Sequence, residues 1–128
     1  MSHDDALNPI PPTWRFDHHG RHVFHVLLDA LVLGEIIVRN LPRGYANFGD
    51  QAHRALSGAY LQTCEAAARC GADRVARFRT ARAEACEAAA CLEALARLGL
   101  VTGDKADAVL ALLWRACAML TKLMRVRR

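Results

Sequence analysis

The feature that most constrains the fold is a stretch of helix-forming residues at positions 66–98, which contains no proline and few β-branched side chains. Alanine, glutamate, leucine and arginine dominate this stretch, and these residues favour the α-helix. One glycine, Gly71, is followed by Ala72 and Asp73, a pattern typical of a helix end followed by a new N-cap. The stretch therefore predicts a helical hairpin and an all-α protein.

Similar signals divide the rest of the chain. Residues around Pro42 and Gly44 end a first helix, and Thr102 is a good N-cap for a last one. We expect helices from 17 or 20 to 40, from 47 or 50 to 70, from 73 to 98, and from Thr102 to about 125. No segment of the sequence alternates apolar and polar residues as a strand does. The chain is predicted to be an antiparallel up-down-up-down four-helix bundle over residues 15–128, preceded by an extended N-terminal arm at residues 1–14.

The cysteines and the most apolar segment indicate where the protein resides. The five cysteines are odd in number, form no C-x-x-C pair and follow no secretory signal, so we expect a cytoplasmic protein with reduced thiols. Residues 23–38 are strongly apolar, but His25, Asp29 and Glu35 interrupt them. The segment is also shorter than a bilayer requires. We therefore expect a core helix and no membrane contact.

The first and last helices each carry two apolar stripes, whereas a bundle helix in a monomer buries about one. Either these helices lie deeper in the bundle or a second chain covers the extra stripe. We favour self-association because an exposed apolar patch of that size is a liability. The expected interface residues are Val23, Val26, Leu33, Ile37, Leu110, Trp114 and Met124.

The positive charge comes almost entirely from arginine, since all but two of the 17 lysine and arginine residues are arginines and the net charge is +4. A GC-rich genome is an alternative cause, because it raises alanine and arginine together. In an up-down-up-down bundle the starts of helices one and three and the ends of helices two and four share one end. We name its expected nucleic-acid-binding residues the basic pole: Arg69, Arg74, Arg77, Arg79, Arg82, Lys122, Arg125, Arg127 and Arg128.

Two interpretations of the basic pole are open. Cations at a helix C-terminus complement the helix dipole, and arginines on the third helix can pair with Asp73 or Glu84. Cations at the N-terminus of the third helix oppose its dipole, however, and this mismatch favours an anion site. Phosphate binding there would be largely independent of base sequence and sensitive to salt.

The histidines near the N-terminus give little support for a metal site. His18, His22 and His25 would share a helix face with His19 beside them, but zinc needs three or four converging ligands and no fourth is evident. We expect these histidines to be solvated or to face phosphate, and we expect no metal site.

Catalytic patterns are also missing from the sequence. No Glu-x-x-His pairs or Walker lysine occur, and His53 lies about three turns from Cys64. Glu65 is expected to be buried and paired with an arginine of the next helix. We expect no catalytic residues, no cofactor and no enzymatic activity.

Several motifs carry a family resemblance. They are Arg15-Phe16-Asp17, residues 41–44, Gly49-Asp50-Gln51, Arg54-Ala55, Glu65, Arg77-Phe78, Ala81-Arg82, Glu87 and residues 98–100. In this order and spacing the chain resembles the bacterial four-helix-bundle proteins encoded by intervening sequences in large-subunit ribosomal RNA genes. The accessory variability proteins of diversity-generating retroelements share that fold.

The resemblance implies a four-helix protomer that assembles as a homo-oligomer, often a ring-like pentamer. It also implies contact with RNA, DNA or a reverse transcriptase. The chain departs from the family at Gln62 and Ala66 and at Ala83 and Glu84, where relatives carry Asn-x-x-Glu-Gly and Gly-Ser. Two functions follow as hypotheses. The first is a nucleic-acid-binding accessory factor, and the alternative is a protein-interaction or scaffold module that binds no nucleic acid.

Overall fold

The computed structural model describes residues 16–125. Within them a short 3-10 helix, η1 (Asp17–Gly20), precedes four long helices: α2 (His22–Arg39), α3 (Ala46–Ala67), α4 (Gly71–Arg97) and α5 (Gly103–Arg125). No strand occurs among the described residues, and the predicted all-α fold is confirmed. The expected N-terminal arm lies outside the described residues, as does Arg15.

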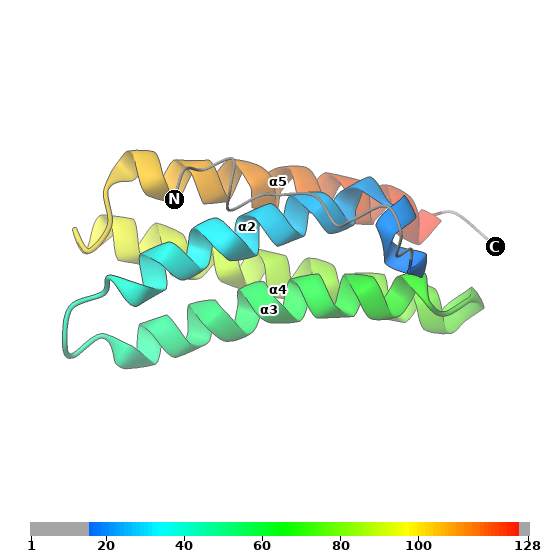
Figure 1. Ribbon diagram of the computed structural model, residues 1–128, viewed down its shortest axis with the longest axis horizontal. Helices are drawn as coiled ribbons and strands as arrows, with labels where there is room; N and C mark the ends of the chain where they lie inside the picture. Colours follow the sequence, from blue (N-terminus) through cyan, green and yellow to red (C-terminus); the bar gives the residue numbers. More distant parts are fainter. Residues whose placement is uncertain (1–15, 126–128) are drawn as a thin grey trace.

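The four long helices lie side by side along the long axis of the molecule (Figure 1). Each packs against its neighbour in the chain, and α2 also packs against α5, which closes the bundle. The loops α2–α3 and α4–α5 lie at one end, and the α3–α4 turn lies at the other end together with the end of α5 (Figure 1). This is the predicted up-down-up-down arrangement.

The α3–α4 turn lies earlier in the chain than predicted, because α3 ends at Ala67 and not at Cys70. Helix α4 begins at Gly71 with Cys70 as its N-cap, so Asp73 lies inside its first turn and is not the cap. Gly71 has a φ of +63°, a left-handed backbone that glycine adopts without steric cost. The chain therefore reverses at Gly71 itself, and the carboxylate of Asp73 still complements the positive end of the α4 dipole.

Small residues bring α3 and α4 together. Ala52, Ala55 and Ala59 of α3 are buried, as are Ala81 and Ala85 of α4. The core stripe predicted on the third helix is confirmed by six buried residues: Phe78, Ala81, Ala85, Ala88, Leu92 and Leu95. Alanines allow close approach of the two helix backbones, and Phe78 and the leucines fill the space towards α2 and α5.

The wide apolar face of α2 is part of the core. Val23, Val26 and Ile37 are only 2%, 3% and 6% exposed, because α2 packs against α3, α5 and η1 at once. These three residues have no surface left for a second chain, and we remove them from the expected interface. None of the described helices is long and apolar enough to cross a membrane.

Candidate nucleic-acid interface

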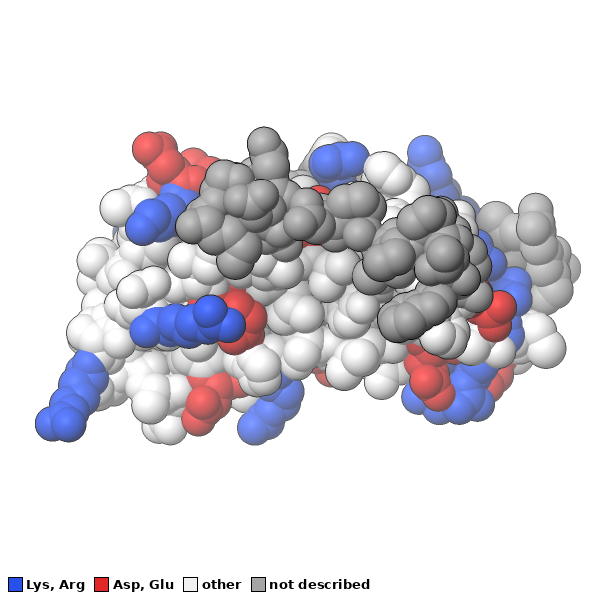
Figure 2. Space-filling model, in the orientation of Figure 1, with Lys and Arg blue, Asp and Glu red and all other residues white. Residues whose placement is uncertain are grey.

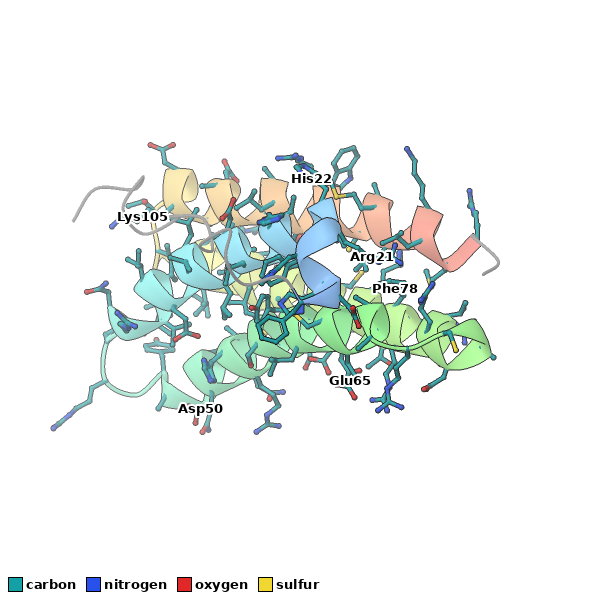
Figure 3. All side chains as sticks on the ribbon, turned by 45° about the vertical axis from the view of Figure 1, so that its right-hand side comes forward. Arg21, His22, Asp50, Glu65, Phe78 and Lys105 are labelled. Carbon is teal, nitrogen blue, oxygen red and sulfur yellow. The ribbon has the colours of Figure 1, made fainter. Side chains whose placement is uncertain are left out.

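Seven residues of the basic pole are described, and the topology gathers them at one end of the bundle. Arg127 and Arg128 lie outside the described residues. Figure 3 shows Arg21, Glu65 and Phe78 towards this end and Asp50 and Lys105 at the other. In the space-filling view, acidic side chains lie among the basic ones at this end (Figure 2). The basic pole is therefore not uniformly positive.

Carboxylates neutralise the arginines of the α3–α4 turn. Arg69 donates to Glu65 at 2.6 Å and to Asp73 at 2.9 Å, while Arg77 lies 3.8 Å from Asp73 and 3.4 Å from the amide oxygen of Gln62. Hydrogen bonding to Arg69 lowers the pKa of Glu65 below its ordinary value. Glu65 is exposed and pairs four residues ahead, so its predicted burial is wrong.

Part of this network was visible in the sequence, because Asp73 and Arg77 lie four residues apart on α4, and opposite charges at that spacing attract one another across a helix turn. Arg69 lies in the turn between α3 and α4, so its pairs with Glu65 and Asp73 depend on the geometry of the turn. The Nε of Arg74 donates to the backbone carbonyl of Arg69 at 2.6 Å, which fixes the side chain but does not neutralise its charge. Glu65 and Asp73 therefore offset the charges of Arg69 and Arg77, and Arg74 has no acidic partner among the described residues.

The cations on the α4–α5 side of the basic pole have no acidic partners among the described residues. Arg79, Lys122 and Arg125 are exposed, and none of them forms an ion pair with another described residue. We call these three residues the free cation cluster. No carboxylate pairs with any of the three, so their charge is uncompensated among the described residues.

Two further cations flank this end of the bundle. The guanidinium of Arg21 lies 5.7 Å from the centre of the Phe78 ring, within cation–π range. Arg115 lies with its Nη2 3.5 Å from Nε2 of His22. The signal for Arg115 was present in the sequence, because it precedes Lys122 by seven residues and so shares its face of α5.

The N-terminal histidines form an aromatic cluster. The Nδ1 of His19 accepts a hydrogen bond from the backbone of Phe16 at 3.0 Å, and the ring of Phe24 contacts both His18 and His19. His19 is buried, so the expectation that it is solvated is wrong. Burial, with the neighbouring charge of His19, lowers the pKa of His18. Among the described residues, no three His, Cys, Asp or Glu side chains converge as a metal site would require.

The positions at which the chain departs from its supposed relatives have separate roles. Gln62 contacts Arg77, Ala66 is fully buried and Ala83 is exposed. Glu84 is half-buried against Gly58, and burial raises its pKa. Glu84 forms no ion pair with the basic pole among the described residues.

A groove of about 670 Å³ lies between α4 and α5, and we call it the α4–α5 groove. Its lining residues are Arg82, Cys86, Ala89, Glu93, Asp107, Leu110, Ala111, Leu113, Trp114, Cys117 and Ala118. Two residues of the expected oligomer interface, Leu110 and Trp114, are among them. The other two that are not core residues, Leu33 and Met124, are half-buried and pack against the core.

Arg82 belongs to this groove as much as to the pole. Its Nε donates to the hydroxyl of Thr121 on α5 at 2.8 Å, and this bond holds the guanidinium against the groove. The Sγ atoms of Cys86 and Cys117 lie 3.8 Å apart between the two helices. Trp114 stands on the outer edge and is 74% exposed.

The sequence matches no protein-family model and no curated protein. The resemblance based on the motifs therefore stays a prediction, and the functional argument depends on the geometry of the basic pole and the groove.

Proposed function

We propose that the protein is a non-enzymatic, homo-oligomeric accessory factor that binds nucleic acid through its basic pole. The observation that carries this proposal is the free cation cluster, in which Arg79, Lys122 and Arg125 lie exposed with no carboxylate paired to them. Exposed cations with no internal partner are available to phosphates, and arginine contacts them with a bidentate fork.

The shape of the surface favours a polyanion over a small anion. The free cation cluster extends across two helices, with Arg79 on α4 and Lys122 and Arg125 on α5, and all three side chains are exposed. A phosphate backbone can contact separated cations one after another, whereas a single phosphate needs converging donors. Such contacts position a strand without reading its bases.

Binding of a labelled single-stranded RNA, measured by fluorescence anisotropy across a salt series, tests the proposal. Three phosphate contacts predict a slope of about −2 in log affinity against log salt concentration. We expect the double variant Arg79→Glu/Lys122→Glu to lose at least tenfold in affinity at low salt. The same oligonucleotide as DNA shows whether the 2′-hydroxyl contributes.

The matched control is Arg43→Glu/Lys105→Glu, which makes the same change in net charge with exposed residues of the opposite end. It should weaken binding only slightly, through the overall charge. Absence of binding at low salt, or an equal loss in both double variants, would contradict the proposal.

A second candidate is the protein-interaction module. The exposed Trp114 and the α4–α5 groove favour it, because tryptophan is enriched where proteins bind one another. A reverse transcriptase is the partner that the resemblance implies, and co-purification with one encoded beside this gene tests that idea. All five cysteines are free, which supports a reducing cytoplasm as the place of action.

A further inference from the structure

We propose that the α4–α5 groove binds a second copy of this chain about a two-fold axis, with the two grooves antiparallel and each Trp114 seated against the other chain. This inference specifies the self-association named in the proposed function and does not depend on nucleic-acid binding. Its support comes from the apolar surface of the groove, its charges and the position of Trp114.

The groove offers an apolar surface to a partner. Trp114 is 74% exposed, the largest exposed fraction among the large apolar side chains of the described residues. Beside it the groove presents Leu110, Ala89 and Ala118. A tryptophan at the edge of an apolar groove is typical of an interface, where it supplies a large rigid area at little entropic cost.

The charges in the groove are segregated along its length. Arg82 lies at the Thr121 end, while Glu93 and Asp107 lie at the other end, about 16 Å away for the eleven helical residues from Arg82 to Glu93. Neither Glu93 nor Asp107 forms an ion pair with another described residue. The Nε bond to Thr121 leaves both terminal nitrogens of Arg82 available.

These charges select the antiparallel arrangement. A second groove turned end for end brings Arg82 of each chain opposite Glu93 and Asp107 of the other, so both ends of the contact are attractive. A parallel arrangement would place like charges together at both ends. The two acids also oppose a nucleic acid in this groove, because a phosphate backbone would pass directly over them.

Trp114 lies at the centre of this pattern. It follows Asp107 by seven residues and precedes Thr121 by seven, which is about 10 Å along α5 in each direction. A two-fold axis through the middle of the groove therefore passes close to Trp114. Residues near such an axis contact their own counterparts, as an isologous interface requires.

The arrangement has a consequence for the basic pole. Antiparallel chains carry their basic poles at opposite ends of the dimer, so one dimer presents two separate phosphate-binding surfaces. This geometry suits bridging of two nucleic-acid segments.

Sedimentation equilibrium of the full chain at micromolar concentration tests the contact. The wild-type protein should have twice the chain mass of 14.1 kDa, and Trp114→Ala should have the single-chain mass. The matched control Leu61→Ala removes another large apolar side chain, 59% exposed on α3, and should keep the dimer. Circular dichroism verifies that each variant is folded.

A charge-reversal experiment tests the antiparallel geometry. Arg82→Glu alone and the double variant Glu93→Arg/Asp107→Arg alone each place like charges at both ends of the contact, so both should be monomeric. Mixed in equal amounts, they should form a heterodimer, because each reversed charge then meets its opposite. Arg82→Glu that keeps the dimer mass would overturn the antiparallel arrangement, because in a parallel one like charges already face each other in the wild type. A mixture that stays monomeric would overturn the charge pairing between the two chains.

The remaining outcomes separate the groove from the rest of the proposed function. Variants that keep the wild-type mass overturn the groove contact alone, and a wild-type monomer overturns self-association with it. Monomeric Trp114→Ala that still binds RNA supports both the dimer contact and the separate basic pole. A dimeric Trp114→Ala that has lost RNA binding would assign the groove to nucleic acid and overturn the groove as the dimer contact.

Discussion

At the scale of single residues, two glycines show how closely the helices approach. An added Cβ at Gly34 of α2 would collide with the side chain of Leu56, and one at Gly58 of α3 would collide with the carboxylate of Glu84. The side chains of Leu56 and Glu84 differ in how easily they can move aside. Leu56 is 1% exposed in the core, while Glu84 is half-buried and can turn towards solvent.

Alanine at these glycines should therefore act in opposite directions. Alanine favours a helix interior over glycine by about 1 kcal/mol, and overpacking a core costs roughly 1–3 kcal/mol. We expect Gly34→Ala to lower the free energy of unfolding by about 1 kcal/mol. Gly58→Ala should raise it by about 0.5 kcal/mol, because water regains the Glu84 carboxylate. Urea unfolding of both variants measures this, and two changes of the same sign would contradict it.

Burial raises the pKa of three side chains that ionise at alkaline pH. Burial raises the pKa of Tyr60 from 10.0 to about 12, with a smaller contribution from its hydrogen-bonding neighbour Cys64. Burial likewise raises the pKa of Cys64 and of Cys117 from 9.0 to about 11. Each group is thus protonated in the folded chain at a pH where it is ionised in the unfolded chain.

Alkaline solution should therefore destabilise the fold. The stability from these groups is complete below pH 9 and is lost as the pH rises towards 11 to 12, because the unfolded chain releases its protons first. We expect the melting temperature under reducing conditions to be nearly level to pH 9 and to fall above it. In Tyr60→Phe/Cys117→Ala the fall should be shallower than in the wild type. The same slope in both proteins would refute the assignment.

At the scale of elements, the α3–α4 hairpin has two structural roles that are carried by the same stretch of sequence. Its alanines pack the two helices closely, and its turn holds a ladder of alternating charges at Glu65, Arg69, Asp73 and Arg77. These ion pairs explain how arginines are tolerated near the N-terminus of α4, where the helix dipole is unfavourable for cations. The carboxylates offset the charge of Arg69 and Arg77, and the free cation cluster lies on the α4–α5 side.

Releasing the ladder should therefore improve nucleic-acid binding. Asp73→Asn removes the carboxylate shared by Arg69 and Arg77, so Arg77 loses its acidic partner and Arg69 keeps only Glu65. We expect RNA affinity at low salt to rise severalfold, with a steeper dependence on salt. Asp104→Asn, the same charge change at the start of α5, should raise affinity much less. Equal gains in the two variants would show that only net charge matters.

At the scale of the whole molecule, the sequence predicted the fold well and the surface less well. The stripe from Phe78 to Leu95 repeats at helical spacing and was buried as predicted. The second stripe of α2 could not be assigned, because periodicity shows that Val23 and Ile37 are apolar but not which neighbour covers them. The α4–α5 groove could not be predicted for the same reason, since Arg82 and Thr121, which meet there, are 39 residues apart in the sequence.

The sequence by itself determined the four helices, their glycine-marked turns and the end of the bundle at which arginine collects. Those properties follow from backbone propensity and helical spacing, which act over a few residues. Only the tertiary structure decided which apolar residues are buried, which side chains line the α4–α5 groove and where Trp114 stands. Those outcomes depend on distances between side chains of different helices, and only packing sets these distances.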